Sequence, residues 1–383
     1  MQAYLDNSAT TRPTDQVIGA MAESMREGFY NPSSPYGPAL QAEKEVTACR
    51  EAVAASLGVS AAEVVFTSGG TEADNLAILG YLASCKKPGK VLYTAVEHPA
   101  VAESCKVAER MGHTAKSIPV LTDGTVDLMA LRELLDASVL LLCIMQVNNE
   151  TGAIQPLEEV AALRDKLCPD AILHVDGVQG YLRIPLSIPK LGIQSYALSA
   201  HKIHGPKGVG ALVFHKDHKV VPRMWGGGQE RGIRSGTENT PGIAGLRCAV
   251  ENYPADAAER MGELKKLLYE TITEHIPAAR INGPALSSPY SAPHILNLSI
   301  PPVRSETMLY ALAGQGVYVG MGSACSSRKQ KISETLRAMH VPKDAAESAI
   351  RFSLSPFTTR EEVLYAAGAL LEQYQDLSKY CRR

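Results

Sequence analysis

The sequence lacks the features that would send a chain into or across a membrane. Its longest apolar run, residues 137–147, is interrupted by Ser138 and Gln146 and is too short to span a bilayer. The first residues show neither a charged start nor an apolar core, so we expect no signal peptide. This pattern predicts a cytoplasmic protein with no membrane partner.

Basic charge and cysteine are also sparse. The 383 residues carry a net charge of -2 with no block of like charges, which argues against a nucleic-acid partner. The eight cysteines include no Cys-x-x-Cys pair, so we expect no zinc ribbon and no metal site. They are too few for a disulfide scaffold. We interpret most of them as small buried hydrophobes of a reduced cytosol.

The first two thirds of the chain alternate between two hydrophobic patterns. Strands are predicted at residues 64–67, 91–96, 139–147, 172–175, 196–198 and 210–214, and helices at 72–83, from 99 and at 157–167. The run at 139–147 is apolar almost throughout, as in a strand buried on both faces. The alternation predicts an α/β domain with a mostly parallel sheet and helices on both sides.

The pattern changes after about Tyr253. Helices are predicted at 257–275, 306–313 and 361–374, with strands at 295–300, 317–319 and 350–354. Residues 295–300 alternate apolar and polar side chains, which indicates an antiparallel strand. We therefore predict a large α/β domain over residues 16–253 and a smaller α+β domain from residues 1–15 and 254–383.

A lysine follows an apolar strand in the segment SAHKIHGP, residues 199–206. Lys202 would be held rigidly and partly desolvated there, which lowers the pKa of an amine and makes it nucleophilic enough to form a Schiff base. Taken alone, the segment is far more typical of a solvated loop lysine.

A carboxylate closes the predicted strand in HVDGVQ, residues 174–179. Ligands of α/β sheets bind at the carboxyl ends of parallel strands. Asp176 could there keep the pyridinium nitrogen of pyridoxal phosphate (PLP) protonated, so that the ring acts as an electron sink. The alternative is a helix N-cap.

A strand runs into two glycines and a helix in TSGGTEADN, residues 67–75. Backbone N–H groups at a helix start bind phosphate, and glycines let the anion approach. The alternative for this segment is a tight turn capped by Thr71.

These three motifs fit one ligand, with phosphate at Gly70 and Thr71, ring nitrogen at Asp176 and aldehyde at Lys202. At this point the sequence resembles the cysteine desulfurases of iron–sulfur-cluster assembly and nitrogenase maturation. The resemblance covers nearly the whole chain and includes YLDNSATT (4–11), NPSS (31–34), VFTSGGTE (65–72), EH (97–98), VNNE (147–150), RSGT (234–237), GSAC (322–325) and IRFS (350–353).

The resemblance implies a fold and a reaction. The fold is that of aspartate aminotransferase, α/β with a mostly parallel seven-stranded sheet in the large domain and a smaller α+β domain that carries the Cys325 loop. The reaction is the PLP-dependent removal of sulfur from L-cysteine, which yields L-alanine and a persulfide on Cys325 for iron–sulfur-cluster or other acceptor pathways. A homodimer is implied, with a sulfur-acceptor or cluster-scaffold protein as a further partner.

The resemblance also implies residue roles. Lys202 holds the cofactor, His98 stacks on its ring and helps to move protons, and Cys325 accepts sulfur. Arg351 takes the substrate carboxylate. The remaining assignments are Asp176 at the ring nitrogen, Gln179 and Asn149 on the ring-oxygen side, Asn149 also at the substrate, Gly70, Thr71, Ser199 and His201 at the phosphate, and Thr237 at the phosphate of the other subunit.

Physical chemistry agrees with three of these roles. Imidazole can cover a pyridine face and shuttle protons, although His98 taken alone reads as a helix-start histidine. The planar fork of Arg351 suits a carboxylate, and its place in an apolar strand argues against a surface salt bridge. Small polar neighbours and nearby cations favour a thiolate at Cys325, whereas Cys143 has apolar neighbours and is predicted to be core.

The chain departs from the family pattern at several positions. Gly177 stands where the family often has alanine, which predicts looser packing behind the ring. Ser326 replaces a common threonine, and residues 328–331 are more basic than expected. The chain ends at Arg383 soon after its last predicted helix, whereas longer relatives dock a scaffold protein through an extension. Selenocysteine or cysteine sulfinate turnover, aminotransfer and a non-catalytic partner role remain the rival functions.

Overall fold

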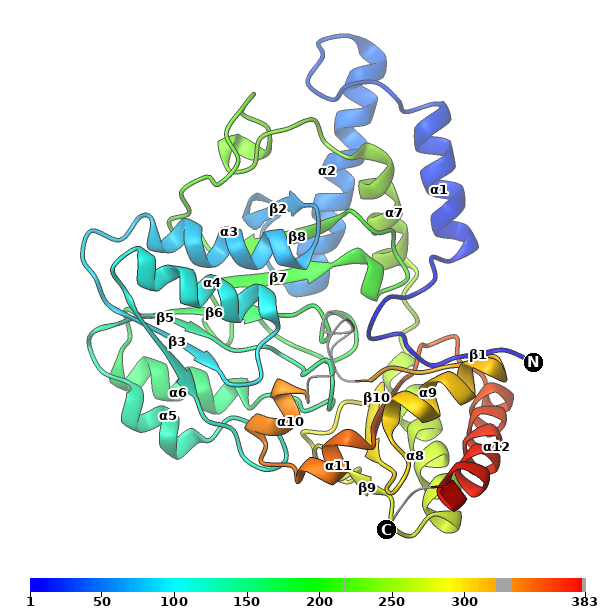
Figure 1. Ribbon diagram of the computed structural model, residues 1–383. Coiled ribbons are helices and arrows are strands. Elements are labelled where there is room, and N and C mark those ends of the chain that lie inside the picture. Colours follow the sequence, from blue (N-terminus) through cyan, green and yellow to red (C-terminus); the bar gives the residue numbers. More distant parts are fainter. Residues whose placement is uncertain (217, 322–332, 381–383) are drawn as a thin grey trace.

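The computed structural model describes residues 1–216, 218–321 and 333–380 (Figure 1). The helices are α1 Asp15–Arg26, α2 Gly37–Leu57, α3 Gly70–Leu82, α4 Pro99–Arg110, α5 Leu128–Leu134, α6 Leu157–Leu167, α7 Thr240–Glu251, α8 Ala257–His275, α9 Ser305–Gly314, α10 Glu334–Ala338, α11 Lys343–Glu347 and α12 Arg360–Leu377. The strands are β1 Ala3–Tyr4, β2 Val64–Thr67, β3 Lys90–Thr94, β4 Thr114–Ile118, β5 Val139–Cys143, β6 Ile172–Asp176, β7 Ser195–Ser199, β8 Gly210–Phe214, β9 Arg280–Ile281, β10 Ile295–Ser299, β11 Val317–Tyr318 and β12 Ala349–Ser353.

The largest sheet has seven strands in the order β2-β8-β7-β6-β5-β3-β4. The pairs β3–β4, β3–β5, β5–β6 and β6–β7 are parallel, whereas β8 runs antiparallel to both β7 and β2. The predicted mostly parallel seven-stranded sheet is confirmed. Because only β8 is reversed, β2 and β7 point the same way, and the carboxyl ends of six strands meet at one edge.

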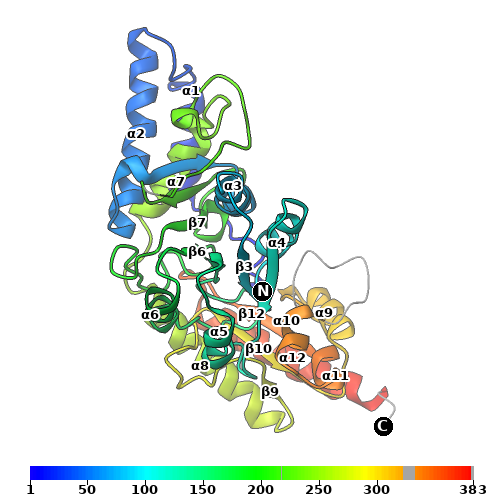
Figure 2. The same ribbon diagram turned by 90° about the vertical axis from the view of Figure 1, so that its left-hand side faces the viewer.

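Both faces of this sheet are buried, because alternate apolar side chains of its strands pack against helices on opposite sides. Leu92, Leu142 and Leu173 join a core with α2, α5, α6 and α7, whereas Val91 and Leu141 join a core with α3 and α4. Successive residues of a strand point to opposite faces, so near-continuous apolar runs give two buried faces. Figure 2 shows the sheet between α3 and α4 on one side and α2 and α6 on the other.

A second structural unit lies beside the sheet edge. Its antiparallel sheet has the order β12-β10-β9, and β1 pairs in parallel with β11. Its core combines Ala3 and Leu5 with side chains of α8, α9 and α12. The N-terminal residues therefore pack with the C-terminal part of the chain. The division into residues 16–253 and residues 1–15 with 254–383 stays a prediction that these two cores support.

Some elements were not foreseen from the sequence. Strand β4 has only Ile118 buried, so no apolar run marked it, whereas β2 at the opposite edge is buried throughout. Helix α1, which buries only Val17, was likewise not predicted. Strand β5 ends at Cys143 rather than at residue 147, although Ile144 and Gln146 still donate backbone hydrogen bonds to the β6 chain. No helix in the described ranges is long and apolar enough to cross a bilayer.

Candidate active site

Strands that point the same way, β2, β6 and β7, bring the motif residues to one edge of the large sheet. Asp176 ends β6, and Ser199 ends β7, where Ala200–Lys202 form a short 3-10 turn. In the parallel register Asp176 lies opposite Ala197. Gly70 begins α3 directly after β2. The expectation that these three motifs share one sheet edge is therefore confirmed.

Lys202 is not a solvated loop lysine. Its Nζ donates to the carbonyl of Ser8 and, at 2.7 Å, to that of Ala9. The pKa of Lys202 is lowered to about 7, mainly by burial and then by the charges of Arg351 and Arg183. At neutral pH a large share of the amine is therefore unprotonated, as a nucleophilic lysine requires.

Asp176 is buried, and its Oδ1 accepts a 2.9 Å hydrogen bond from the N–H of Val178. The carboxylate thus stabilises a turn, and in the structure no helix begins directly after it for it to cap. Burial raises the pKa of Asp176, while His98 and Lys202 oppose the rise. A buried carboxylate with these neighbours suits a group that brings its own positive charge, such as a pyridinium.

The start of α3 is open to an anion. Its N-cap is Gly69, with a φ of 153°, and no side chain in the described part of the chain caps the helix. The alternative in which Thr71 caps a turn is therefore wrong. A Cβ on Gly70 would lie 2.6 Å from Val178 and 3.8 Å from Ser199, so this glycine brings the helix start against the Asp176 and Ser199 segments. Uncapped N–H groups beside a serine suit a phosphate.

Three further residues assigned to the phosphate are not part of this contact. His201 Nδ1 lies 3.2 Å from Thr10 Oγ1, and burial lowers the pKa of His201 to about 4. Thr71 and Thr237 are both exposed. Thr237 follows Arg234, which pairs with Glu72 of α3 at 2.8 Å. This ion pair connects the segment that carries Thr237 to the helix start.

His98 has the capping role that its sequence position suggested. It is the N-cap of α4, and its Nδ1 accepts from the N–H of Ala100 at 3.1 Å. The bond leaves the proton of a neutral ring on Nε2. Burial lowers the pKa of His98, Asp176 raises it and Lys202 lowers it, so the ring interacts with both site residues. Capping and a place at the site are compatible.

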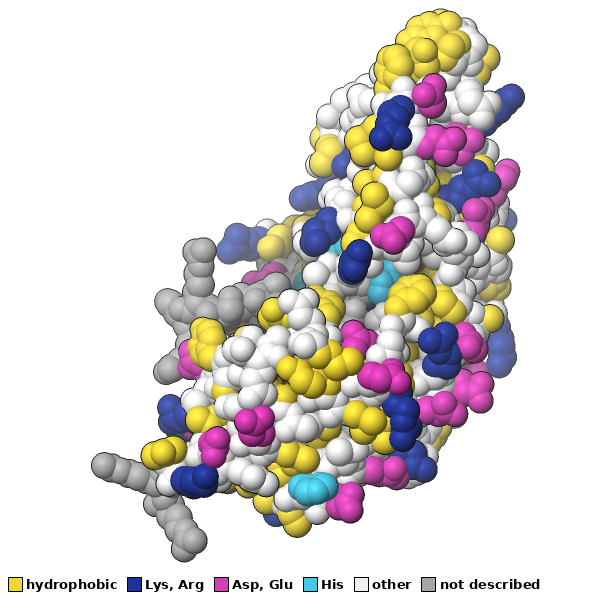
Figure 3. Space-filling view, turned by 90° about the vertical axis from the view of Figure 1, so that its right-hand side faces the viewer, with side chains coloured by type: hydrophobic (Ala, Val, Ile, Leu, Met, Phe, Trp, Pro, Cys, Tyr) yellow, Lys and Arg dark blue, Asp and Glu magenta, His cyan; other side chains and the backbone are white. Residues whose placement is uncertain are grey.

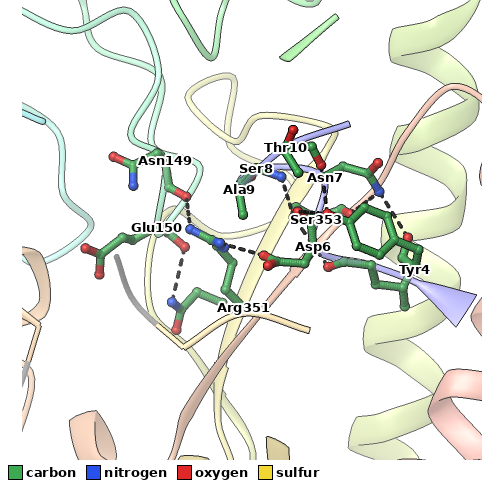
Figure 4. Close-up of polar contacts among 12 residues, drawn as sticks. Tyr4, Asp6, Asn7, Ser8, Ala9, Thr10, Asn149, Glu150, Arg351 and Ser353 are labelled. Carbon is green, nitrogen blue, oxygen red and sulfur yellow. Dashed lines mark hydrogen bonds and ion pairs between the residues drawn. The ribbon is translucent and has the colours of Figure 1, made fainter. Parts of the chain in front are cut away.

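Arg351 is buried rather than part of a surface salt bridge. Its Nη2 pairs with Asp6 Oδ1 at 2.6 Å, and its Nη1 donates to the carbonyl of Asn149 at 2.9 Å (Figure 4). Figure 4 also shows that the side-chain amide of Asn149 points away from Arg351. A Cβ on Gly320 would lie within 2.7 Å of both Arg351 and Asp6. The guanidinium is thus enclosed by main chain and a carboxylate, in a fixed orientation.

The N-terminal segment joins these groups together. The carbonyl of Ser8 accepts from Lys202 and from Gln179 Nε2, the latter at 3.0 Å. Thr11 donates to the carbonyl of His201 at 2.9 Å. The sequence pattern included residues 4–11 in the family resemblance but assigned them no role. Figure 4 shows Asp6 to Thr10 as a strip of chain beside Arg351.

Two ionisable residues near the site, Arg183 and Glu97, received no role from the sequence, although Glu97 lies in one of the motifs that carry the resemblance. Arg183 donates to the carbonyl of Lys202 and to that of Gln179, the latter at 3.2 Å. Glu97 accepts from Thr94 and from the N–H of Met145, both at 2.7 Å, and burial raises its pKa to about 8. A charged residue inside the apolar segment YLRIPL was the available signal for Arg183.

Packing behind Asp176 is tight, so the predicted looseness at Gly177 is wrong. A Cβ on Gly177 would lie 1.8 Å from Cζ of Tyr196. The phenol ring of this buried tyrosine occupies the space that an alanine methyl would take.

The cysteines divide as expected where they are described. Cys143 is completely buried in the core, and Cys49, Cys105 and Cys168 are buried as well. Cys85 and Cys248 are half-buried. Cys325, the predicted sulfur acceptor, lies outside the described residues.

Comparison with known proteins gives one consistent family. The model of the aminotransferase class-V family matches residues 3–365. A curated relative, cysteine desulfurase IscS of Dictyoglomus turgidum, is 36% identical over 386 residues that cover 99% of this chain and 97% of the relative. The cysteine desulfurase of Cereibacter sphaeroides is 38% identical, and the match covers 99% of this chain and 98% of that relative.

Solved structures agree with the sequence relatives. A NifS-like protein superposes with a TM-score of 0.92 at 38% identity, covering 98% of this chain and all of that one. A protein named SspA, solved in complex with cysteine, has a TM-score of 0.82 at 28% identity and covers 93% of this chain.

Proposed function

This chain belongs to the aminotransferase class-V family, and we infer from that membership and from the site a PLP-dependent cysteine desulfurase with Lys202 as the cofactor lysine and Cys325 as the sulfur acceptor. The observation that carries the proposal is the convergence of an amine, a buried carboxylate and a buried guanidinium at one sheet edge. Lys202, Asp176 and Arg351 supply them.

The residues at this edge suit PLP. The uncapped start of α3 and Ser199 would hold the phosphate, with Thr71 and His201 near it. Asp176 would pair with the ring nitrogen, and Gln179 and Asn149 would lie on the ring-oxygen side. Bound in this way, the cofactor supplies an electron sink for the carbon skeleton of the substrate.

Lys202 and His98 would transfer protons to and from the substrate. An amine with a pKa of about 7 can accept the α-proton of the substrate once the substrate has displaced it from the cofactor. The neutral ring of His98 keeps its proton on Nε2, because Nδ1 is occupied by Ala100. The imidazole can therefore donate from Nε2 while it covers the ring.

Arg351 would select the amino acid. Its fork binds a carboxylate in a fixed orientation, because Asp6 and the carbonyl of Asn149 hold two of its N–H groups. The substrate carboxylate then has one defined place beside Asn149.

The sulfur transfer is balanced without an external oxidant. The Cys325 thiolate attacks the substrate sulfur, a new S–S bond forms and the Cβ–S bond breaks. The electron pair of the broken bond stays with the carbon skeleton, which takes up one proton at Cβ, regains the α-proton and leaves as L-alanine. Cys325 is left as a persulfide, which a sulfur-acceptor or cluster-scaffold protein would consume.

A homodimer is the proposed assembly. The end of the molecule formed by α1, α2 and the turn between them exposes Met25, Phe29, Tyr36 and Leu40, and Figure 3 shows hydrophobic surface gathered there. Trp225, on the segment that leads to Thr237, is 76% exposed. Exposed apolar patches of this kind are typical of interfaces. Thr237 would then reach the phosphate site of the other subunit. We also propose that the enzyme is cytoplasmic.

Mass spectrometry after incubation with L-cysteine tests the proposal. The peptide that contains Cys325 should gain one sulfur atom, and L-alanine should appear in the same molar amount. Cys85 and Cys248 are half-buried free thiols and serve as internal controls that should remain unmodified. Alanine release with an unmodified Cys325 and a persulfide elsewhere would contradict the assignment.

A further inference from the structure

Two buried polar side chains interlock behind the turn that follows Asp176. The Tyr196 hydroxyl donates to Gln146 Oε1 at 2.7 Å and also lies 3.3 Å from the carbonyl of Gly177. Both side chains are about 1% exposed. A buried hydroxyl or amide without its hydrogen bond costs free energy, so the pair keeps one arrangement.

Two glycines of the turn make room for this pair. A Cβ on Gly177 would lie 1.8 Å from Tyr196 Cζ, and a Cβ on Gly180 would lie 2.0 Å from Gln146 Oε1. Neither residue has a positive φ, so the backbone conformation alone does not require glycine at these positions. Occupied space is the reason for glycine at both.

Gln146 connects both ends of the turn. Its N–H donates to the carbonyl of Asp176 at 2.8 Å, and its Nε2 donates to the carbonyl of Ile184 at 3.1 Å. Residues 176–184 are therefore held at the Asp176 end by the backbone N–H of Gln146 and at the Ile184 end by its side-chain amide. Tyr196 fixes the orientation of that amide, because its hydroxyl leaves Oε1 as the acceptor and Nε2 as the donor.

The same turn carries much of the proposed cofactor site. Asp176 begins it, and Gln179 donates to the carbonyl of Ser8 beside Lys202. Val178 meets Gly70 at the start of α3. A shift of the turn would therefore move the ring-nitrogen partner and the phosphate end together.

We propose that Tyr196 is a positioning residue for the cofactor, which acts through Gln146 and Gly177 to set where the Asp176 carboxylate meets the ring nitrogen. The proposal rests on the proposed PLP function and deepens it. It assigns Gly177 and Tyr196 as a matched pair, in which the glycine is required only while the tyrosine is present.

The first test is a double-mutant cycle on cofactor affinity. Gly177→Ala alone should weaken PLP binding to the cofactor-free protein by about ten- to a hundredfold, the usual scale of overpacking. Tyr196→Met removes the phenol atoms and keeps an adaptable apolar side chain. The double variant should then bind PLP more tightly than Gly177→Ala. A Gly177→Ala protein with parental affinity, or a double variant no better than Gly177→Ala, would overturn the pairing.

The second test keeps the ring and removes only the hydroxyl. Tyr196→Phe should weaken PLP binding by about three- to tenfold, as one lost hydrogen bond predicts. It should also move the visible absorption of the bound cofactor, because contacts at the ring nitrogen tune its electronics. A lower melting temperature with unchanged affinity and absorption would mean a purely structural role and would refute positioning.

Matched controls come from the second structural unit. Tyr365→Phe loses a 2.7 Å bond to the carbonyl of Gln315, and Gly368 has open space among the described residues. Tyr365→Phe and Gly368→Ala should leave PLP affinity and absorption unchanged. If the parent chain itself does not bind PLP, the proposed function fails; if the parent binds and the Tyr196 variants match it, only this inference fails.

Discussion

Asp6 Oδ1 and Arg351 Nη2 lie 2.6 Å apart, across 345 positions of sequence. Arg351 is 2% exposed, so its charge is compensated inside the protein rather than by water. The pair joins the N-terminal segment to β12. Removing one partner of such a pair leaves a buried charge without compensation.

Asp6→Asn should therefore destabilise the protein. The expected loss in the free energy of unfolding, measured by denaturant titration of the cofactor-free protein, is somewhat below the roughly 3–5 kcal/mol of a fully buried pair, because the Asp6 side chain is 23% exposed. Asp376→Asn is the control, because its 2.9 Å pair with Lys379 is exposed and should contribute less than about 1 kcal/mol. Equal losses in the two variants would contradict the role of burial.

Attachment of PLP to the cofactor-free protein should depend on pH through Lys202. Only the unprotonated amine reacts, and the pKa of Lys202 is lowered to about 7. The attachment rate should therefore rise with pH, with a midpoint near 7, and level off above it, as followed by stopped-flow absorbance. Lys202→Ala should show no attachment. Asp6→Asn should lower the midpoint, because Asp6 raises the pKa of Lys202; a midpoint above 9 in the parent would rule out a desolvated lysine.

Glu97→Gln should change how stability depends on pH. Burial raises the pKa of Glu97 to about 8, so the folded protein keeps a proton that the unfolded chain releases above its ordinary value of 4.5. The parent therefore loses stability as pH rises from about 4.5 to 8. Glutamine is neutral throughout, so the stability of the variant relative to the parent should increase across that window and stay constant above it. Glu103→Gln, at an exposed position, should show no such trend.

Mixed dimers test whether Thr237 acts across an interface. Thr237→Val and Lys202→Ala subunits should each be inactive as homodimers. A mixed dimer should contain one site with both lesions and one intact site, so activity should return when the subunits are combined. Verified mixed dimers without activity would show that Thr237 serves its own subunit or no site.

Cys325→Ala should separate cofactor chemistry from sulfur transfer. The variant should bind PLP and L-cysteine as the parent does, because Lys202 and Arg351 remain. It should release neither L-alanine nor persulfide sulfur at a measurable rate. Cys85→Ala and Cys248→Ala should retain full turnover. A Cys325→Ala protein with near-parental turnover would refute the assignment of the acceptor.

Much of the site was predictable because its signals are local. Asp176, Ser199 and Gly70 stand where a strand ends or a helix begins, and strand direction alone brings those positions to one edge. Apolar runs over residues 172–175 and 210–214 likewise indicated interior strands, and the run over 64–67 indicated β2, an edge strand that is buried throughout. Strand β4 carried no such signal because, unlike β2 at the opposite edge, it buries only Ile118.

The amino-acid sequence by itself determined the residue types at each strand end, and hence the chemistry of the sheet edge. Only the tertiary structure decided which distant groups meet there. Asp6 reaches Arg351, Ser8 reaches Lys202 and Tyr196 fills the space of Gly177 because separate elements pack together. A sequence pattern records the period of one element, whereas such contacts depend on how several elements are placed in space.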